Sequence, residues 1–358
     1  MMFARKMFVA GLALALGFPL AWTASVASRP PQLPSPPSPP MSQQDQPGGT
    51  GPRIRSTVEL VVVPVTVKDS QGQLVGDLRR DEFRVFEDGV EQQVSLFSVE
   101  AFPLSVVVAV DDDLRTRAAD QVKKSLIAIA GAFSASDEVS IGRFDSFYTP
   151  VMDFTSDNDQ LITELQRLDL NSSMPGVGSE VMTGGPTVNG RPAPGAPTVS
   201  QVPLGAGAST KHINDAVYQA AEILRGRDSQ RRKMIILVSD GVNARNNTYS
   251  FDETLQRLLS SDISVYAIGV DSAVIERGAT VLSRYARATG GDVYYAARAA
   301  TLPKFYAQVA EQARHQYTIG YLPAQTDRSK SYHSIEVRIR RPGLTLLTRE
   351  GYYTGVAP

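Results

Sequence analysis

The 358-residue sequence contains no cysteine. This absence excludes disulfide bonds, thiolate zinc sites, a cysteine nucleophile and a lipidated cysteine. Histidine is scarce as well: His212, His315 and His333 are the only three, and they lack the spacing of metal ligands. We therefore expect surface or capping positions for all three histidines. Without disulfides the fold must depend on its hydrophobic core, and a content of 42% hydrophobic and 20% charged residues is ordinary for a soluble globular protein.

The first 27 residues have the pattern of a secretory signal peptide. Arg5 and Lys6 precede an apolar stretch, residues 7–22, and small residues follow at 25–27. The pattern predicts cleavage after Ala27, a secreted or periplasmic protein and no membrane insertion after cleavage; an uncleaved membrane anchor is the alternative. Cleavage would remove two cations and no acids, so the formal net charge would move from -1 to -3, which argues against nucleic acid as a partner.

Both ends of the remaining chain have β-strand patterns. Residues 28–53 are rich in proline and poor in apolar side chains, which predicts a disordered linker. Residues 54–101 contain apolar runs separated by the turn sequences DSQG and EDG, but a β segment of this size needs further strands. Residues 316–358 supply candidates, so we predict that the two segments pack together as a small β-sandwich-like domain. The predicted strands are residues 58–67, 83–87, 92–97, 317–321, 334–340 and 344–349.

The middle of the chain, residues 102–315, is different in kind. Apolar strand-like runs alternate with amphipathic helical runs, which predicts a mostly parallel sheet with helices on both faces. One stretch, residues 171–209, breaks the alternation, and its glycine and proline content predicts a flexible insertion. The predicted strands are residues 104–110, 138–143, 234–238, 263–269 and 292–295, and the predicted helices are residues 117–133, 160–168, 213–224, 254–260, 281–289 and 303–314.

A run of carboxylates follows the first strand of this middle segment. The stretch VVVAVDDDLRTR, residues 107–118, leads from an apolar strand directly into three aspartates. In open parallel sheets the ligand crevice lies at the C-terminal ends of the strands. Three carboxylates there need a positively charged partner. It can be a divalent cation, magnesium with a phosphoryl substrate, or the protein's own lysines and arginines, and the residues alone do not decide among these.

Several segments occur in the order of a known family: SVVVAVD, ASDEVSIGRFDS, NDAVYQAAEIL, KMIILVSDG, ISVYAIGV, ATGGDVYYA and RHQYTIGYLP. Through them, residues 102–315 resemble a von Willebrand factor type A (VWA) domain. With the flanking segments DEFRVFEDGVEQQVSLFS and TREGYY, the chain from about residue 56 to 353 resembles the bacterial secreted proteins described as VWFA-related. The resemblance implies a Rossmann-like α/β fold and a non-enzymatic function in protein–protein binding.

The resemblance also implies a metal-ion-dependent adhesion site (MIDAS) on top of the sheet. Its pattern is Asp-x-Ser-x-Ser after the first strand, a threonine before the helix NDAVYQAAEIL, and an aspartate in the Asp-Gly turn after the central strand. Asp111 and Asp240 match the first and last positions. The two serine positions, however, are Asp113 and Arg115, and an arginine cannot ligate a cation.

The threonine position departs from the pattern too. It is Lys211, or Thr210 if the alignment shifts by one residue. We therefore predict a degenerate, metal-free face in which protein cations neutralise the aspartates, with no cofactor and with a protein as partner. The alternative is a site for Mg²⁺ or Ca²⁺ on Asp111, Asp113 and Asp240, with Thr210 as a neutral ligand.

An enzymatic alternative rests on the same aspartates. VAVDDDLR resembles the first motif of haloacid-dehalogenase-like phosphatases, with Asp111 as nucleophile, Asp113 as acid/base and Ser239 as a phosphate-binding hydroxyl. That family's second acidic pair is missing, because Asp271 after YAIGV is a single carboxylate. We therefore predict a protein without enzymatic activity. Its predicted binding face comprises Asp111, Asp113, Arg115, Thr210, Lys211 and Asp240.

Overall fold

The computed structural model describes residues 60–170, 187–188, 191–192, 211–275, 280–324 and 330–354. The predicted signal peptide and linker and the site candidate Thr210 lie outside the described residues. Of the predicted insertion 171–209, the structure describes only a short antiparallel pair, β8 (Thr187–Val188) with β9 (Arg191–Pro192). Within the described ranges, no helix has the length and apolar character needed to cross a membrane.

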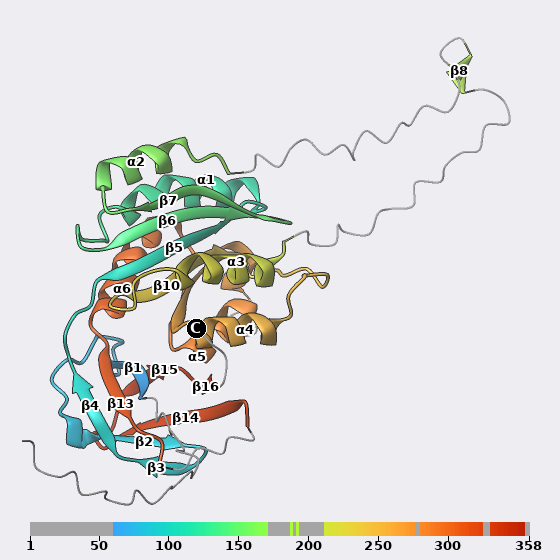
Figure 1. Cartoon of the computed structure of the whole chain (residues 1–358). Helices are drawn as coiled ribbons and strands as arrows, with labels where there is room; N and C mark the ends of the chain where they lie inside the picture. The colour runs from blue at the N-terminus through green and yellow to red at the C-terminus, as the bar shows by residue number, and fades with distance from the viewer. Residues whose placement is uncertain are drawn as a thin grey trace, which may run out of the picture. The chain divides into compact units, whose positions relative to one another are not determined.

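A six-stranded sheet with the order β12-β11-β10-β5-β6-β7 forms the centre of the α/β part (Figure 1). Five strands run parallel and β7 pairs antiparallel with β6. β5 is buried along its whole length, which explains its mostly apolar sequence, LSVVVAVD. The strands are β5 (Leu104–Asp111), β6 (Glu138–Phe144), β7 (Tyr148–Thr155), β10 (Arg232–Ser239), β11 (Ile263–Gly269) and β12 (Val293–Tyr295).

Helices cover both faces of this sheet (Figure 1). α1 (Thr116–Leu126), α2 (Asn158–Arg167) and α6 (Leu302–Arg314) pack on one face, and α3 (Ile213–Arg225), α4 (Phe251–Ser260) and α5 (Val281–Thr289) pack on the other. Side chains alternate along β5. Val106 and Val108 lie in the hydrophobic core beneath α1, α2 and α6, and Val107 and Ala109 lie in the core beneath α3, α4 and α5. The short 3-10 helices are η1 (Arg80–Glu82), η2 (Ile127–Ile129), η3 (Asp271–Val274) and η4 (Ala299–Thr301).

The two ends of the chain form a separate pair of antiparallel sheets, ordered β15-β1-β13-β4 and β16-β14-β2-β3. Each sheet combines strands from both ends, because β1 pairs with β13 and β2 pairs with β14. A third hydrophobic core lies among these strands. The strands are β1 (Val61–Lys68), β2 (Phe83–Glu87), β3 (Val90–Gln92), β4 (Val94–Ser98), β13 (Tyr317–Tyr321), β14 (Tyr332–Ile339), β15 (Thr345–Thr348) and β16 (Gly351–Tyr353). The predicted fold class, a Rossmann-like α/β sheet beside a small β sandwich, is therefore confirmed.

Some elements differ from the sequence prediction. Residues 92–97 were expected to form one strand, but the chain changes sheets at Gln93, so β3 and β4 belong to opposite layers. The predicted strands also omit β7, and β16 is indicated only by the flanking segment TREGYY, through its resemblance to the VWFA-related proteins. β7 is an edge strand with mixed burial and contains Pro150, and such a strand lacks the long apolar run on which the prediction depends.

The β sandwich contacts the edge of the α/β sheet at which the parallel strands begin. Arg232, the first residue of β10, donates hydrogen bonds of 2.7–3.1 Å to acceptors in residues 313–318. Burial lowers the pKa of this guanidinium to about 10. Lys68 of β1 forms an ion pair of 2.5 Å with Asp292, which precedes β12. The opposite side of the sheet, where the parallel strands β5 and β10 end, is not used for this contact. We call it the C-terminal edge of the sheet.

Gly290 contributes to the same contact. It ends α5 in the left-handed conformation, with φ of 77°. A Cβ atom at this position would lie 2.6 Å from the backbone nitrogen of Arg349, in the C-terminal β segment. Both the backbone angle and the close approach therefore require glycine.

We expect Gly290→Ala to lower the free energy of unfolding by at least about 2 kcal/mol, because the left-handed conformation alone costs an L-residue about 1–2 kcal/mol. The measurement is chemical denaturation of the whole chain. Gly226→Ala is the matched control, since Gly226 also follows a helix but has φ of -74° and no atom near its added Cβ. Equal stability of the two variants would contradict this account of the contact.

Candidate functional site

Asp111 lies at the C-terminal end of β5 and is completely buried. Its Oδ1 accepts a hydrogen bond of 3.0 Å from the backbone N–H of Asp113, and its Oδ2 accepts one of 2.7 Å from the hydroxyl of Ser239 at the end of β10. Burial raises the pKa of Asp111 to about 6, although the positive charge of Lys211 and the Ser239 hydrogen bond act in the opposite direction. The carboxylate is thus held by the backbone of Asp113 and by the side chains of Ser239 and Lys211.

Lys211 supplies the positive charge between the ends of β5 and β10. Its Nζ lies 2.7 Å from Oδ2 of Asp240 and 3.4 Å from Oδ2 of Asp111, and the residue is only 4% exposed. The other oxygen of Asp240 accepts the backbone N–H of Val242 at 3.0 Å. Burial lowers the pKa of Lys211, but the attraction of the two carboxylates outweighs burial and the pKa is raised above its usual value. The ammonium therefore stays charged in this buried position.

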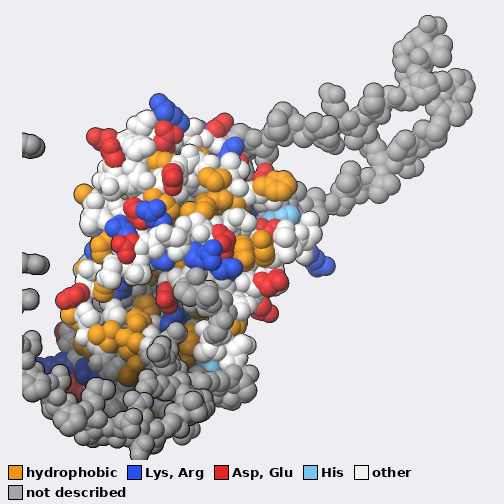
Figure 2. Space-filling view, in the orientation of Figure 1, with side chains coloured by type: hydrophobic (Ala, Val, Ile, Leu, Met, Phe, Trp, Pro, Cys, Tyr) orange, Lys and Arg blue, Asp and Glu red, His pale blue; other side chains and the backbone are white. Residues whose placement is uncertain are grey.

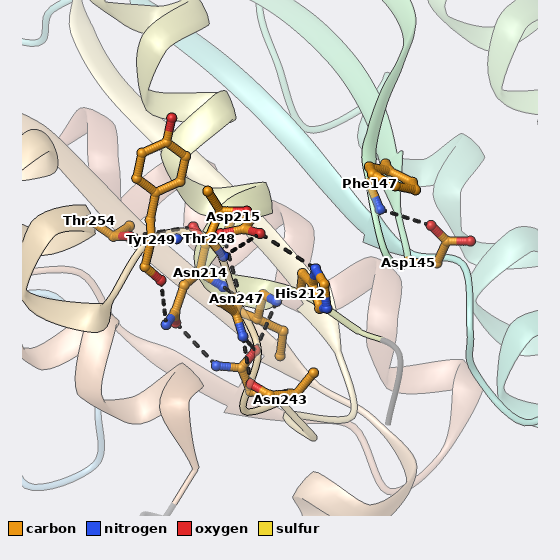
Figure 3. Close-up of polar contacts among 12 residues, drawn as sticks. Asp145, Phe147, His212, Asn214, Asp215, Asn243, Asn247, Thr248, Tyr249 and Thr254 are labelled. Atoms are coloured by element: carbon orange, nitrogen blue, oxygen red, sulfur yellow. Dashed lines mark hydrogen bonds and ion pairs between the residues drawn. The ribbon is translucent and has the colours of Figure 1, made fainter. Parts of the chain in front are cut away.

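The backbone around Lys211 is fixed on two sides. Its carbonyl oxygen accepts the N–H of Ala244 at 2.8 Å, from the loop between β10 and α4. The next residue, His212, donates its N–H to the carbonyl of Asp145 at 2.8 Å, from the turn between β6 and β7. Figure 3 shows Asp145 and Phe147 on this turn, next to His212. The position of the ammonium follows from three loops that meet at one edge of the sheet.

Asparagines of the β10–α4 loop cap the start of α3 (Figure 3). Oδ1 of Asn243 and Oδ1 of Asn247 accept backbone N–H groups of residues 213–215 at 2.9–3.4 Å. In return, the carboxylate of Asp215 accepts the N–H groups of residues 248–249 at 2.8 and 2.9 Å. This network was not predicted from the sequence, although the asparagine-rich stretch DGVNARNNT after the central strand indicates side-chain caps.

The other charged residues after β5 point to different partners. The guanidinium of Arg115 is 80% exposed, and its Nε lies 3.4 Å from Oδ2 of Asp271, beyond the end of β11. Asp112 pairs with Arg143 at 3.0 Å, and Asp113 is exposed. The expectation that Arg115 would lie among the aspartates is therefore wrong. The buried space between the two site carboxylates is filled by the ammonium of Lys211, while Arg115 lies at the outer start of α1.

The residues of this site do not fit a divalent cation. Mg²⁺ and Ca²⁺ need oxygen ligands at about 2.0–2.6 Å. The space from which a cation would contact Asp111 and Asp240 together is taken by the Lys211 ammonium, and the second serine position of the adhesion-site pattern is an arginine that points elsewhere. Among the described residues, no group of three or more Asp, Glu or His side chains is arranged to hold a metal ion.

The remaining predicted residues can also be placed. His212 lies beside the site, with Nδ1 3.4 Å from Asp215, and His315 is exposed at the end of α6. His333 was expected near the surface but is 1% exposed inside the β sandwich, where Nδ1 lies 3.0 Å from Asp88. The expectation failed because the alternating burial of β14 directs this side chain inward.

Comparisons with known proteins agree with this architecture. The profile of the von Willebrand factor type A domain family matches residues 199–308, which include Lys211, Asp240 and Asp271. At the level of sequence, no curated protein matches the chain.

Solved structures match at low similarity. Proximal thread matrix protein 1 from the mussel byssus is 12% identical with a TM-score of 0.41, over 61% of this chain and 49% of its own. The chain thus spans about half the length of that protein. BatB from Bacteroides thetaiotaomicron is 13% identical with a TM-score of 0.39, over 59% of this chain and 98% of its own. A von Willebrand factor type A protein from Catenulispora acidiphila is 10% identical with a TM-score of 0.42, over 84% and 76%.

These structural scores are too low to support an argument about function. The assignment rests on the matched segment and on the strand order of the chain itself. The family match identifies residues 199–308 as part of a von Willebrand factor type A domain, and the strand order of the α/β part is that of a Rossmann-like sheet.

Proposed function

We propose that this chain is a secreted or periplasmic, non-enzymatic binding protein whose VWA domain holds a protein partner at the C-terminal edge of its sheet without a divalent cation. The location rests on the signal-peptide pattern of residues 1–27. The metal-free mode rests on one observation, the ammonium of Lys211 between Asp111 and Asp240.

The Lys211 ammonium lies between the two carboxylates, where a bridging metal cation would otherwise bind. It attracts both carboxylates, one at the end of β5 and one directly after β10, so the loops after these strands can approach one another. It does not offer the open coordination position through which a metal holds a partner's carboxylate, because its nitrogen is buried and faces acceptors of its own chain. Partner binding must then depend on the side chains at the surface of this edge.

The architecture supports binding at this edge. The β sandwich covers the other edge, so the loops after β5, β6, β10 and β11 are left for a partner. Phe147, in the turn after β6, has 78% of its surface exposed. On the face seen in Figure 2, acidic and basic side chains are interspersed among the described residues, a distribution that does not favour nucleic acid as the partner.

The site does not support phosphatase chemistry. A nucleophilic Asp111 would need an oxygen open to substrate, but this residue has no exposed surface and both of its oxygens accept hydrogen bonds. Ser239, the candidate phosphate-binding hydroxyl, donates to Asp111 and is itself buried. A binding function therefore accounts for the geometry better than a catalytic one.

Calorimetric titration tests the metal-free mode. We expect no binding of Mg²⁺, Mn²⁺ or Ca²⁺ to the purified protein below millimolar concentration, because a cation would have to displace the buried Lys211 ammonium. Lys211→Thr removes that ammonium and supplies an oxygen ligand, so this variant should bind Mg²⁺ or Ca²⁺ at least tenfold more tightly than the parent protein.

The double variant Lys211→Thr, Asp240→Asn is the control, and it should lose the gained affinity because one of the two carboxylates is neutralised. Tight cation binding by the parent protein that Asp240→Asn abolishes would contradict the proposal. It would favour instead the Mg²⁺ or Ca²⁺ site on Asp111, Asp113 and Asp240.

Stability of the variant Lys211→Met should depend on pH. At pH 8 we expect a loss of about 3–5 kcal/mol, because two buried carboxylates remain without their cation. The folded protein binds the Asp111 proton more tightly than the unfolded chain does, since burial raises the pKa to about 6 from an unfolded value near 3.9. Without Lys211 this pKa should rise further, so protonation should recover part of the loss at pH 5.

Chemical denaturation of parent and variant at pH 8 and pH 5 measures this difference. Lys304→Met is the matched control, because Lys304 is exposed on α6 and should change little at either pH. A loss of the same size at both pH values would show that Asp111 does not titrate in response to Lys211.

Affinity capture tests partner binding itself. Immobilised protein should retain the same secreted or envelope protein with and without EDTA, and Phe147→Ser should lose it. Leu322→Ser is the control, since Leu322 is 50% exposed but lies beyond β13 in the sandwich. Loss of the partner in EDTA, or equal loss in both variants, would contradict the proposal.

A further inference from the structure

Three large apolar side chains are exposed at the edge that carries Lys211. Ile275, Phe147 and Val242 have 87%, 78% and 39% of their surface exposed, and they follow β11, β6 and β10. Single exposed apolar residues are common, but Ile275 and Phe147 are the two most exposed large hydrophobic residues among those described. Their position on one edge indicates a contact surface.

Asp271 lies at the same edge, directly after β11, and has an unusual environment. Its backbone adopts a positive φ of 47°, a conformation that aspartate tolerates better than most residues. Its Oδ2 is buried, yet no donor among the described residues makes a hydrogen bond to it. A buried carboxylate oxygen without a hydrogen-bond donor is costly, and its ionic partner among the described residues, Arg115, does not supply a hydrogen bond.

Arg115 occupies the position in front of this oxygen. Its Nε lies 3.4 Å from Oδ2 of Asp271, without the geometry of a hydrogen bond, and its side chain is 80% exposed. The guanidinium extends from the end of β5 past the end of β10 to the end of β11. Because the Arg115 side chain is mostly exposed and the contact lacks hydrogen-bond geometry, this ion pair is weak, and a second cation with better geometry can displace Arg115.

The charge of a suitable partner follows from these contacts. A partner carboxylate would find the Lys211 ammonium buried and already bonded to Asp240, and it would meet the negative charge of Asp271. A partner guanidinium or ammonium would instead supply the missing donor to Asp271. Apolar side chains beside that cation would contact Ile275 and Val242, which follow the same pair of neighbouring strands.

We propose that the partner of this edge presents an arginine or lysine flanked by apolar side chains, and that its cation replaces Arg115 at Asp271. This inference rests on the proposed function, protein binding at the C-terminal edge of the sheet, and specifies the chemistry of the partner. It reverses the arrangement in which a partner's carboxylate provides the central contact.

Selection from an unbiased displayed-peptide library on the whole purified protein tests the proposal. Enriched peptides should carry arginine or lysine next to Leu, Ile, Phe or Val. Affinities of a synthesised peptide for variants then identify the contacts. Asp271→Asn keeps the shape and tolerates positive φ, so it should remove only the charge and weaken binding at least tenfold, and Ile275→Ser should weaken it as well.

Arg115→Ala provides the most discriminating result. If Arg115 competes with the partner's cation, its removal should strengthen binding severalfold, whereas a direct contact between Arg115 and the partner would make removal weaken binding. Leu322→Ser should leave the affinity unchanged, and thermal melting of each variant checks that the fold is intact.

Each other outcome overturns the inference in a distinguishable way. Two outcomes would contradict the proposed partner chemistry but not binding at this edge. One is enrichment of acidic peptides whose affinity falls in Ile275→Ser. The other is enrichment of basic peptides whose affinity is unchanged by Asp271→Asn. Peptides indifferent to Asp271→Asn, Ile275→Ser and Phe147→Ser together would overturn the proposed function too. A selection without any enriched peptide also counts against the inference.

Discussion

The organisation of the site depends on one buried cation, the ammonium of Lys211. It lies between Asp111 and Asp240, the residues that end or follow two neighbouring central strands, and without it their charges would repel in a region that excludes water. Its position is in turn fixed by backbone contacts from the β6–β7 and β10–α4 loops. The asparagine caps on α3 hold the second of these loops against the helix, so the loops and the ammonium stabilise one another.

The two edges of the parallel sheet, where its strands begin and where they end, make different contacts. Strands from before and after the VWA domain pair to form the sandwich, which contacts the edge where β10, β11 and β12 begin. The same pairing brings the two ends of the domain together beneath the sheet. The edge where the strands end is left with Lys211, the exposed apolar residues and the Arg115–Asp271 pair. Under the proposed function, structural support and partner binding would use opposite edges and would not compete for the same side chains.

Much of the fold could be predicted because it follows from local patterns. The strands at 104–111, 232–239 and 263–269 are buried over most of their length, so a predominantly apolar run identified each of them. Elements at the periphery gave weaker patterns: β7 is a half-exposed edge strand, and the turn at Gln93 splits one predicted strand between two sheets. His333 was misjudged for a related reason, because its burial depends on which side of β14 faces the sandwich core.

The sequence by itself determined the fold class and the candidate residues of the site, since strand ends, Asp-Gly turns and departures from the adhesion-site pattern can be recognised along the chain. Only the tertiary structure decided which of the protein's own cations lies between Asp111 and Asp240. Lys211 and Arg115 were both candidates, and the choice depends on the path of the backbone: Lys211 is held between three loops and points inward, while Arg115 begins α1 and reaches outward to Asp271. Distances of a few ångströms between residues 29 to 156 positions apart decide this outcome, and local sequence patterns do not predict such distances.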